Sequence, residues 1–236
     1  MIIAMPTLAT IEIDKMPKLS KRLRKIASFI PKGAFLSDVG SDHGYLPIAL
    51  IEEGTINYSQ AIENKKGPYT RLVENIERWE LSERIFPSFS SGLDELDPRA
   101  NCLSICGMGG LLIVQILKEH KEKLDIIQSI VVDPHRDEPV VREYLSSIGY
   151  KIEEESIILD KGIFYSVMRW VKTNDEVRYN ADELALGPIN IIDKSDDFLP
   201  FLKRKEELLQ EIAKAEVHEE KRKEIQSKIE MIRRYL

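Results

Sequence analysis

A loop near residue 40 combines glycines with two acids and a histidine, in the stretch Asp38-Val39-Gly40-Ser41-Asp42-His43-Gly44-Tyr45-Leu46. It follows an apolar run typical of a buried strand and precedes a helix-like segment, whose first turn offers free backbone N–H groups. Gly40 permits a tight turn and a close approach of the backbone to a ligand. Asp38 and Asp42 would repel the pyrophosphate that dinucleotide enzymes bind at such a turn, and the glycines lack the Gly-x-Gly-x-x-Gly spacing. The loop therefore favours S-adenosylmethionine, with its cationic sulfonium and zwitterionic tail, over an ordinary turn between strand and helix.

Acidic and small residues also follow the next two strand-like segments. Glu63 stands 23 residues beyond Gly40, where an acid can accept both ribose hydroxyls of a nucleoside cofactor; a solvated loop acid is the alternative. Ser91 and Leu93, on either side of Gly92, end the third expected strand, at the turn that meets the adenine ring in this architecture. We expect Ser91 to bind the exocyclic amine and Leu93 to pack on the ring face.

Glycines are concentrated after the fourth expected strand, in Cys106-Gly107-Met108-Gly109-Gly110. They let a flat base approach the backbone beside the expected methyl group, because open α/β sheets bind ligands at the carboxyl ends of their strands; a flexible loop is the alternative. Asp133-Pro134-His135 ends the fifth strand on the same edge. Asp133 or His135 can therefore move a proton or hydrogen-bond a substrate base, unless the tripeptide only starts a helix. The four histidines are too scattered for a metal site, and we expect no metal.

Strand-like and helix-like segments alternate before and after these motifs. We expect strands at 35–39, 58–62, 85–89, 102–106 and 127–132, and helices at 44–53, after Pro68, through Leu117 and over 140–148. Two further strand-like runs, 150–159 and 163–171, are joined by Asp160-Lys161-Gly162, which indicates a hairpin. The pattern predicts an α/β fold: a Rossmann-like class I methyltransferase sheet, mostly parallel, with a final antiparallel hairpin.

The two ends of the chain differ from this central domain. We expect an N-terminal extension at 1–17, a cofactor-binding methyltransferase domain at 18–172, and a linker with a C-terminal α-helical coiled-coil domain at 173–236. The linker, rich in polar residues, carries one short helix at most. Two apolar stripes after Phe198 favour two antiparallel helices over one long rod, since a rod would expose its stripe unless it dimerised.

Composition describes an ordinary globular protein of 236 residues with 43% hydrophobic and 31% charged residues and a formal net charge of −6. No apolar run reaches the ~20 residues needed to span a bilayer, and we expect no signal peptide and no membrane partner. Cys102 and Cys106 share one strand face about 13 Å apart, too far for a disulfide, which favours a reducing cytoplasm. We expect a monomer.

These residues together resemble the bacterial tRNA adenine-22 N1-methyltransferase family, over nearly the whole chain from Lys18. The resemblance is carried by residues 19–23, 38–47, Glu63 with Gly67-Pro68, Gly92-Leu93, 107–110 and Gly187-Pro188. It implies cofactor contacts by Asp38, Gly40, Ser41, Asp42, His43, Leu46, Glu63, Asn64, Pro68, Ser91, Gly92, Leu93, Cys106, Gly107 and Met108. Two positions depart from the family: Ser91 replaces the acid of Gly-Asp-Gly-Leu, and Asp133-Pro134-His135 replaces Gln-Pro-Asn.

The resemblance implies methylation of adenine N1 at position 22, in the D-arm region of tRNA. Adenine N1 has an in-plane lone pair, so it can attack the methyl group without prior deprotonation once the base is unstacked and aligned. We expect Asp133 to contact the exocyclic amine or stabilise the cationic product. His135 is a second candidate there, and Asp42 or His43 would position cofactor or base.

A basic helix over residues 19–30 then becomes the expected phosphate-binding surface, together with the C-terminal helices. The candidate RNA contacts are Lys18, Lys21, Arg22, Arg24, Lys25, Lys203 and Arg204. Two other functions stay open. One is methylation of another RNA, a protein or a small molecule, and the other is a noncatalytic cofactor-binding interaction module, which the altered Asp133-Pro134-His135 motif allows.

Overall fold

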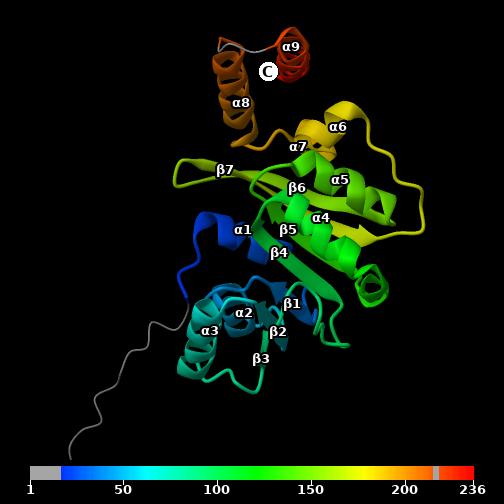
Figure 1. The fold of residues 1–236 in the computed structure, drawn as a ribbon. Coiled ribbons are helices and arrows are strands. Elements are labelled where there is room, and N and C mark those ends of the chain that lie inside the picture. The colour runs from blue at the N-terminus through cyan, green and yellow to red at the C-terminus, as the bar shows by residue number, and fades with distance from the viewer. Residues whose placement is uncertain (1–16, 215–217) are drawn as a thin grey trace, which may run out of the picture.

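The computed structural model describes residues 17–214 and 218–236 and is built on a seven-stranded sheet with the order β3-β2-β1-β4-β5-β7-β6 (Figure 1). The strands are β1 Leu36–Val39, β2 Ser59–Glu63, β3 Ile85–Phe89, β4 Cys102–Met108, β5 Ser129–Pro134, β6 Tyr150–Asp160 and β7 Ile163–Lys172. Strands β1 to β5 pair in parallel, while β7 runs antiparallel to β5 and to β6. The expected parallel sheet with a final antiparallel hairpin is confirmed.

Helices cover both faces of this sheet. They are α1 Lys21–Phe29, α2 Tyr45–Glu52, α3 Lys66–Arg78, α4 Gly110–Glu119, the 3-10 helix η1 Lys121–Ile126, α5 Glu138–Ser147, α6 Ala181–Leu186, α7 Pro188–Asp193, α8 Phe198–Lys214 and α9 Glu219–Arg233. One apolar cluster packs α4 and α5 on the sheet, and a second packs α1, α2 and α3 on its other face. Because both faces are covered, β1, β2 and β5 are buried along their whole length, as expected for parallel strands.

Strand β5 begins and ends two residues later than the sequence pattern predicts. It includes Asp133 and Pro134, and Asp133 pairs with Cys106 of β4 in the register of the sheet. The prediction ended the strand at Val132 because acid and proline usually break strands. Because β5 continues to Pro134, its pairing with β4 holds the Asp133 carboxylate inside the protein, where 0% of the residue is exposed.

Helix α1 begins after Ser20, whose Oγ accepts a hydrogen bond from the Leu23 N–H at 3.2 Å. This is an N-cap, which satisfies one of the free donors of the first turn. The helix packs across β5, β6 and β7, so it lies directly beside the carboxyl edge of β5. Its packing brings Arg22, Ile26 and Phe29 onto one inward face, at spacings of four and three residues.

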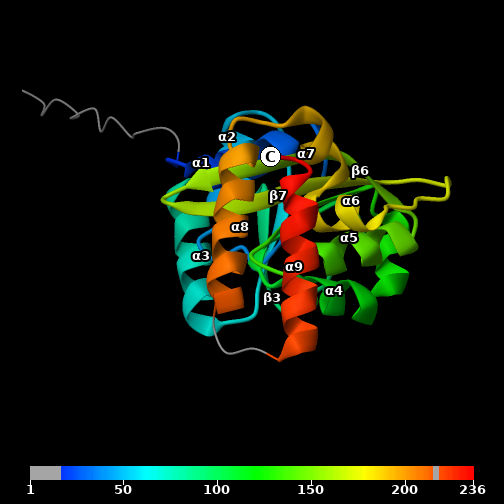
Figure 2. The same ribbon diagram turned by 90° about the horizontal axis from the view of Figure 1, so that it is seen from above.

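The C-terminal segment forms the expected pair of helices, and Figure 2 shows α8 and α9 side by side. Phe198, Leu202 and Ile232 pack on Ile157 of β6, which anchors the pair to the sheet. Farther along α8, Leu208 and Ile212 are 49% and 41% exposed, so the predicted stripe extends beyond this core. The linker contains two short helices, α6 and α7, where one was expected at most, because Gly187 ends the first and Pro188 starts the second.

Two expectations about absences concern the described residues alone. In residues 17–214 and 218–236, no helix is long and apolar enough to span a membrane. In the same ranges, no three His, Cys, Asp or Glu side chains are grouped so that they would hold a metal ion. Residues 1–16, most of the expected N-terminal extension, lie outside the described residues.

Candidate active site

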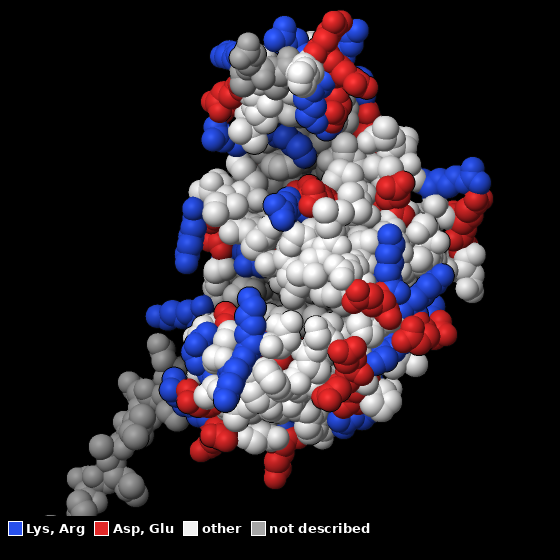
Figure 3. Space-filling view, in the orientation of Figure 1, with Lys and Arg blue, Asp and Glu red and all other residues white. Residues whose placement is uncertain are grey.

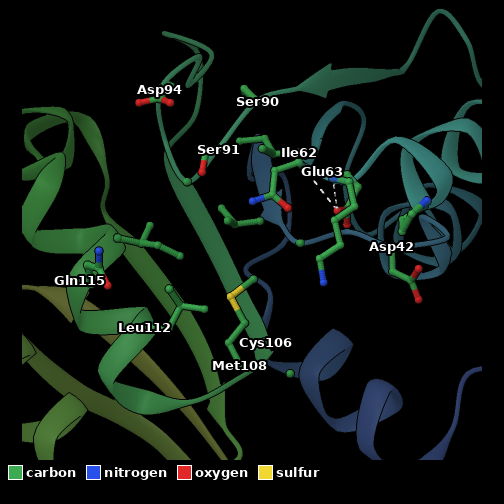
Figure 4. A pocket seen from close by; sticks show the side chains of 18 of the residues that line it. Asp42, Ile62, Glu63, Ser90, Ser91, Asp94, Cys106, Met108, Leu112 and Gln115 are labelled. Carbon is green, nitrogen blue, oxygen red and sulfur yellow. Dashed lines mark hydrogen bonds between the residues drawn. The ribbon is translucent and has the colours of Figure 1, made fainter.

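A cavity of about 760 Å³ lies at the carboxyl ends of the parallel strands (Figure 4). In Figure 4, Ser90, Ser91 and Asp94 lie on one side of it, Leu112 and Gln115 of α4 on a second, and Glu63 and Asp42 across from them. Ten of the predicted cofactor residues line this cavity: Gly40, Asp42, Glu63, Asn64, Pro68, Ser91, Gly92, Cys106, Gly107 and Met108. The structure thus gathers groups from four separate strand ends into one site.

Gly40 makes the turn at the bottom of this cavity. Its φ of +74° is a left-handed conformation, and its N–H donates to the Ile62 carbonyl at 2.9 Å. A Cβ built on Gly40 would lie 2.4 Å from Cε of Met108, the flexible end of a β4 side chain, which would have to move. The left-handed φ is therefore the main reason for a glycine at this turn.

Glu63 ends β2 with its carboxylate held over the following turn. Oε1 accepts hydrogen bonds from the N–H groups of Asn64 and Lys65 at 3.0 and 2.8 Å. Among the described residues Oε2 accepts none, and the residue lines the cavity while being only 7% exposed. A fixed carboxylate with one available oxygen is suited to accepting hydrogen bonds from the hydroxyl groups of a ligand.

Asp94 and His120 form a polar pair in the wall of the cavity that the sequence reasoning missed. His120 Nε2 and Asp94 Oδ1 are 2.8 Å apart, and His120 Nδ1 lies 2.9 Å from the Ile116 carbonyl. Burial opposes the charge of this imidazole, but the hydrogen bonds to Asp94 and Ile116 outweigh burial and raise the pKa of His120. Asp94 stands three residues beyond Ser91, so the turn keeps a carboxylate although Ser91 itself is neutral.

Leu93 is not placed as expected. Its side chain is fully buried in the core cluster under α4 and does not line the cavity, so the prediction that it packs on the adenine ring is wrong. The neighbouring Gly92 has a φ of +54°, and this turn directs Leu93 toward the core and leaves Ser90, Ser91 and Asp94 at the cavity.

A second cavity, of about 290 Å³, adjoins the first. Gly40, Asp42, Cys106 and Gly107 line both, so the two spaces meet between the ends of β1 and β4. Asp38, Ser41, His43 and Leu46 were predicted as cofactor contacts, but they line only this second cavity, together with Arg22, Leu23, Tyr45 and His135. The predicted cofactor residues are therefore divided between two adjoining spaces.

Asp38 stabilises the loop by hydrogen bonds within the protein. Its Oδ2 accepts from Ser41 Oγ at 2.6 Å and its Oδ1 accepts from Ser104 Oγ at 2.5 Å. Burial raises the pKa of Asp38, and the two serine hydrogen bonds oppose that rise. Because both oxygens are already bonded, Asp38 orients the loop more than it offers a contact to a ligand.

Arg22, which lines the second cavity, forms an ion pair with Asp133. Arg22 Nε donates to Asp133 Oδ2 at 2.6 Å, and its guanidinium carbon lies 4.9 Å from the centre of the Tyr165 ring. Asp133 Oδ1 is buried without a hydrogen-bond partner, and the Gly107 N–H lies close enough to help lower the pKa of this carboxyl. Arg22 was predicted to contact RNA phosphates; α1 turns this side chain inward toward Asp133, and 20% of it is exposed.

His135 and Cys106 complete the surroundings of this ion pair. The His135 ring lies 5.6 Å from the Tyr165 ring, edge to face, and lines the second cavity. Burial raises the pKa of Asp133, and Arg22 opposes the rise most strongly, followed by His135. Burial also raises the pKa of the Cys106 thiol well above its usual value, with a further contribution from Asp133.

The other predicted RNA contacts lie on the surface. Lys21 pairs with Asp197 at 2.8 Å, Arg24 with Glu53, and Arg204 with Glu207 at 3.4 Å, while Lys25 lies over the Phe29 ring. Lys18 and Lys203 are exposed. The Lys21–Asp197 pair joins the start of α1 to the start of α8, so the two predicted RNA-binding elements are neighbours.

Comparison with known proteins assigns this arrangement to a family. A family model described as a methyltransferase domain matches residues 19–168. The tRNA (adenine(22)-N(1))-methyltransferase of Bacillus subtilis is 29% identical over 228 residues, which cover 92% of this chain and 96% of that protein.

Solved structures agree with this match. A Streptococcus pneumoniae protein, provisionally assigned as a tRNA (m1A22) methyltransferase, is 33% identical with a TM-score of 0.88, covering 93% of this chain and 100% of that one. The same protein has been solved in complex with S-adenosyl-L-methionine, with a TM-score of 0.87. The M. capricolum relative, solved with S-adenosyl-homocysteine, is 26% identical, covers 92% of this chain and 97% of that one, and has a TM-score of 0.82. This chain therefore belongs to the tRNA (adenine-22 N1)-methyltransferase family of class I methyltransferases.

Proposed function

We propose that this protein transfers a methyl group from S-adenosylmethionine to N1 of adenine 22 in the D-arm region of tRNA. The observation that carries the proposal is the pair of adjoining cavities that meet at Gly40, Asp42, Cys106 and Gly107. One space takes the cofactor and the other takes the target base, so methyl donor and acceptor face one another across the shared residues. The family relationship supports the same reaction.

The larger cavity fits S-adenosylmethionine by its shape and by its donor and acceptor groups. Glu63 offers Oε2 to the ribose hydroxyls, and Asn64 and Pro68 border the same side. Asp94, fixed by His120, and Ser91 are available to the adenine amine at the opposite end. When bound, S-adenosylmethionine supplies an electrophilic methyl group on a cationic sulfonium. Asp42 gives the shared boundary a negative charge that favours such a cation.

A hydrogen-bond acceptor for the adenine amine lies behind the lining of the smaller cavity. Asp133 Oδ1 is buried and unpaired, and although Asp133 does not line the cavity itself, its partner Arg22 and its neighbour His135 do. We place the adenine exocyclic amine against this oxygen, which sets the neighbouring N1 toward the shared boundary. Arg22 holds the other oxygen and opposes the rise in the pKa of Asp133 that burial causes, which favours the charged carboxylate. The charged carboxylate then also stabilises the cation that N1 methylation creates.

The tRNA body contacts the surface around the cavity mouth. We assign phosphate contacts to Lys18, Lys21, Arg24 and Lys25 near α1 and to Lys203 and Arg204 on α8. Exposed ion pairs such as Lys21–Asp197 contribute little stability, so a phosphate can replace the carboxylate partner. We further propose that the enzyme works as a monomer. We also place it in the cytoplasm, and the free thiols of Cys102 and Cys106 support this location.

Methylation of transcribed, unmodified tRNA tests the proposal. With S-adenosylmethionine present, we expect primer extension to stop opposite adenine 22, because a methyl group on N1 blocks Watson–Crick pairing. A tRNA with guanine at position 22 is the matched control and should give no stop. A stop at another nucleotide, or none with every tRNA offered, would contradict the assignment.

A further inference from the structure

The second cavity, which we assign to the target base, is called the acceptor cavity below. A third hollow lies beside it and has no role in the reaction described above. It encloses about 410 Å³ and is lined by Pro17, Lys18, Tyr45, Asn75, Arg78 and Trp79. These residues come from the segment before α1, the start of α2 and the end of α3. Figure 3 shows lysine and arginine side chains gathered on the lower left of the molecule, over the region where Figure 1 has α1, α2 and α3.

Tyr45 connects this hollow to the acceptor cavity, because it lines both. Its ring is stacked on His43, with centres 5.3 Å apart and planes 16° from parallel, and the residue is 42% exposed. Asn75 fixes the loop by donating from Nδ2 to the His43 carbonyl at 3.0 Å. A base that leaves the acceptor cavity therefore meets a prearranged aromatic platform.

The far side of the hollow carries a second aromatic residue and a cation. Trp79 is half-buried at the end of α3, and Arg78 beside it is exposed. Within residues 17–214 and 218–236, the Arg78 side chain makes no hydrogen bond or ion pair, whereas the side chains of Arg24 and Arg22 on α1 are both paired. Flat aromatic faces next to a guanidinium match a nucleotide, which offers a base to stack on and a phosphate to bind.

We propose that this hollow holds the nucleotide adjacent to the methylated one in the RNA chain, its base on Tyr45 or Trp79 and its phosphate at Arg78. This rests on the proposed function, because it takes the substrate to be RNA. Consecutive nucleotides share one phosphate, so a base drawn into the acceptor cavity brings its neighbour to the residue that lines both spaces. Holding that neighbour helps to keep the target base unstacked.

Arg78→Ala and Arg71→Ala form a matched pair for the test. Both arginines are exposed on α3 and lack ion pairs in the described part of the chain, but Arg71 lines none of the three cavities. With unmodified tRNA, Arg78→Ala should raise KM about ten-fold at unchanged kcat and unchanged S-adenosylmethionine affinity. It should also lower the slope of log affinity against log salt by about 0.7 to 0.9, the value of one lost phosphate contact. Arg71→Ala should match the wild type.

Equal KM values and salt slopes for the two variants would overturn the proposal. If the wild-type protein methylated no tRNA, the proposed function itself would fail, which is a separate outcome. Tryptophan fluorescence gives an independent readout, since the chain has two tryptophans and Trp170 is fully buried in the sheet. Unmodified tRNA should quench the wild-type emission, and Trp79→Phe should abolish the quenching. Full quenching in Trp79→Phe would place the RNA elsewhere.

Discussion

Arg142–Glu155 and Arg22–Asp133 are both ion pairs between an arginine on a helix and a buried carboxylate on the same sheet. In the first, Glu155 Oε1 accepts from Arg142 at 2.7 and 3.0 Å, and Oε2 accepts from the Asn190 N–H at 3.4 Å. In the second, Asp133 Oδ2 accepts from Arg22 at 2.6 Å and Oδ1 has no partner. Burial raises the pKa of both acids, and in both the arginine opposes it.

The difference separates a fully bonded structural pair from the pair to which we assign a role in the reaction. Glu155 is fully bonded and sits under Gly187, where an added Cβ would lie 2.1 Å from Oε2, so it fixes the junction of β6 with α6 and α7. Asp133 leaves Oδ1 without a partner, buried next to Arg22, which lines the second cavity. A buried unsatisfied acceptor costs about 1–3 kcal/mol. In the reaction proposed above, the adenine amine supplies the missing hydrogen bond.

Removing the arginine should therefore affect stability much more at the structural pair. Arg142→Ala leaves Glu155 buried and uncompensated, and we expect the free energy of unfolding to fall by about 3–5 kcal/mol. Arg22→Ala should cost clearly less, since 20% of the Arg22 side chain is exposed and its removal would open the second cavity toward Asp133. Urea denaturation of both variants measures this. If both variants lost the same free energy of unfolding, the distinction between the two ion pairs would be wrong.

Removing the negative charge should affect catalysis at the functional pair. Asp133→Asn keeps the shape but loses the charge that binds the adenine amine, and a hydrogen bond to a charged group is worth about 1.5–3 kcal/mol. We expect single-turnover methylation of tRNA to slow by about ten- to a hundred-fold, with cofactor affinity unchanged. Glu155→Gln is the matched control: its folded fraction should methylate at the wild-type rate. A wild-type rate in Asp133→Asn would remove Asp133 from the mechanism.

Sequence reasoning predicted the fold and ten of the residues that line the larger cavity, because both depend on local signals. Glycine marks the turn at Gly40, and an acid at the end of a strand marks Glu63; each carries its role with little dependence on distant residues. The bounds 85–89 of β3 and the hairpin after Tyr150 follow from alternation and from a short glycine-containing link. Parallel order then brings these strand ends to one edge.

Sequence reasoning failed where the rotation of a side chain, or its pairing with a distant residue, decides where that side chain lies. Arg22 lies on a helix with several cations, and only the contact with Asp133, 111 residues away, shows that it faces inward. Its face is shared with Ile26 and Phe29, a spacing that could have flagged it. A leucine side chain suits an apolar core as well as the face of a bound ring. The backbone turn at Gly92 decides that Leu93 points into the core. The Asp94–His120 pair joins residues 26 apart and had no signal along the chain.

The pH dependence of methylation gives the smallest and most specific contrast between the two pairs. The charged form of Asp133 binds the adenine amine and the cationic product more strongly than the protonated form, so the rate should fall as pH drops through its pKa. Burial raises that pKa, while Arg22, His135 and the nearby Gly107 N–H lower it. Arg22→Gln removes the strongest opposing charge, so the acid limb of the single-turnover rate should move to higher pH, with a loss of a few-fold at neutral pH. Arg24→Gln on the same helix, paired with exposed Glu53, should leave the limb in place. A limb that stays fixed in Arg22→Gln would mean that Arg22 only packs against Tyr165 and does not set the charge of Asp133.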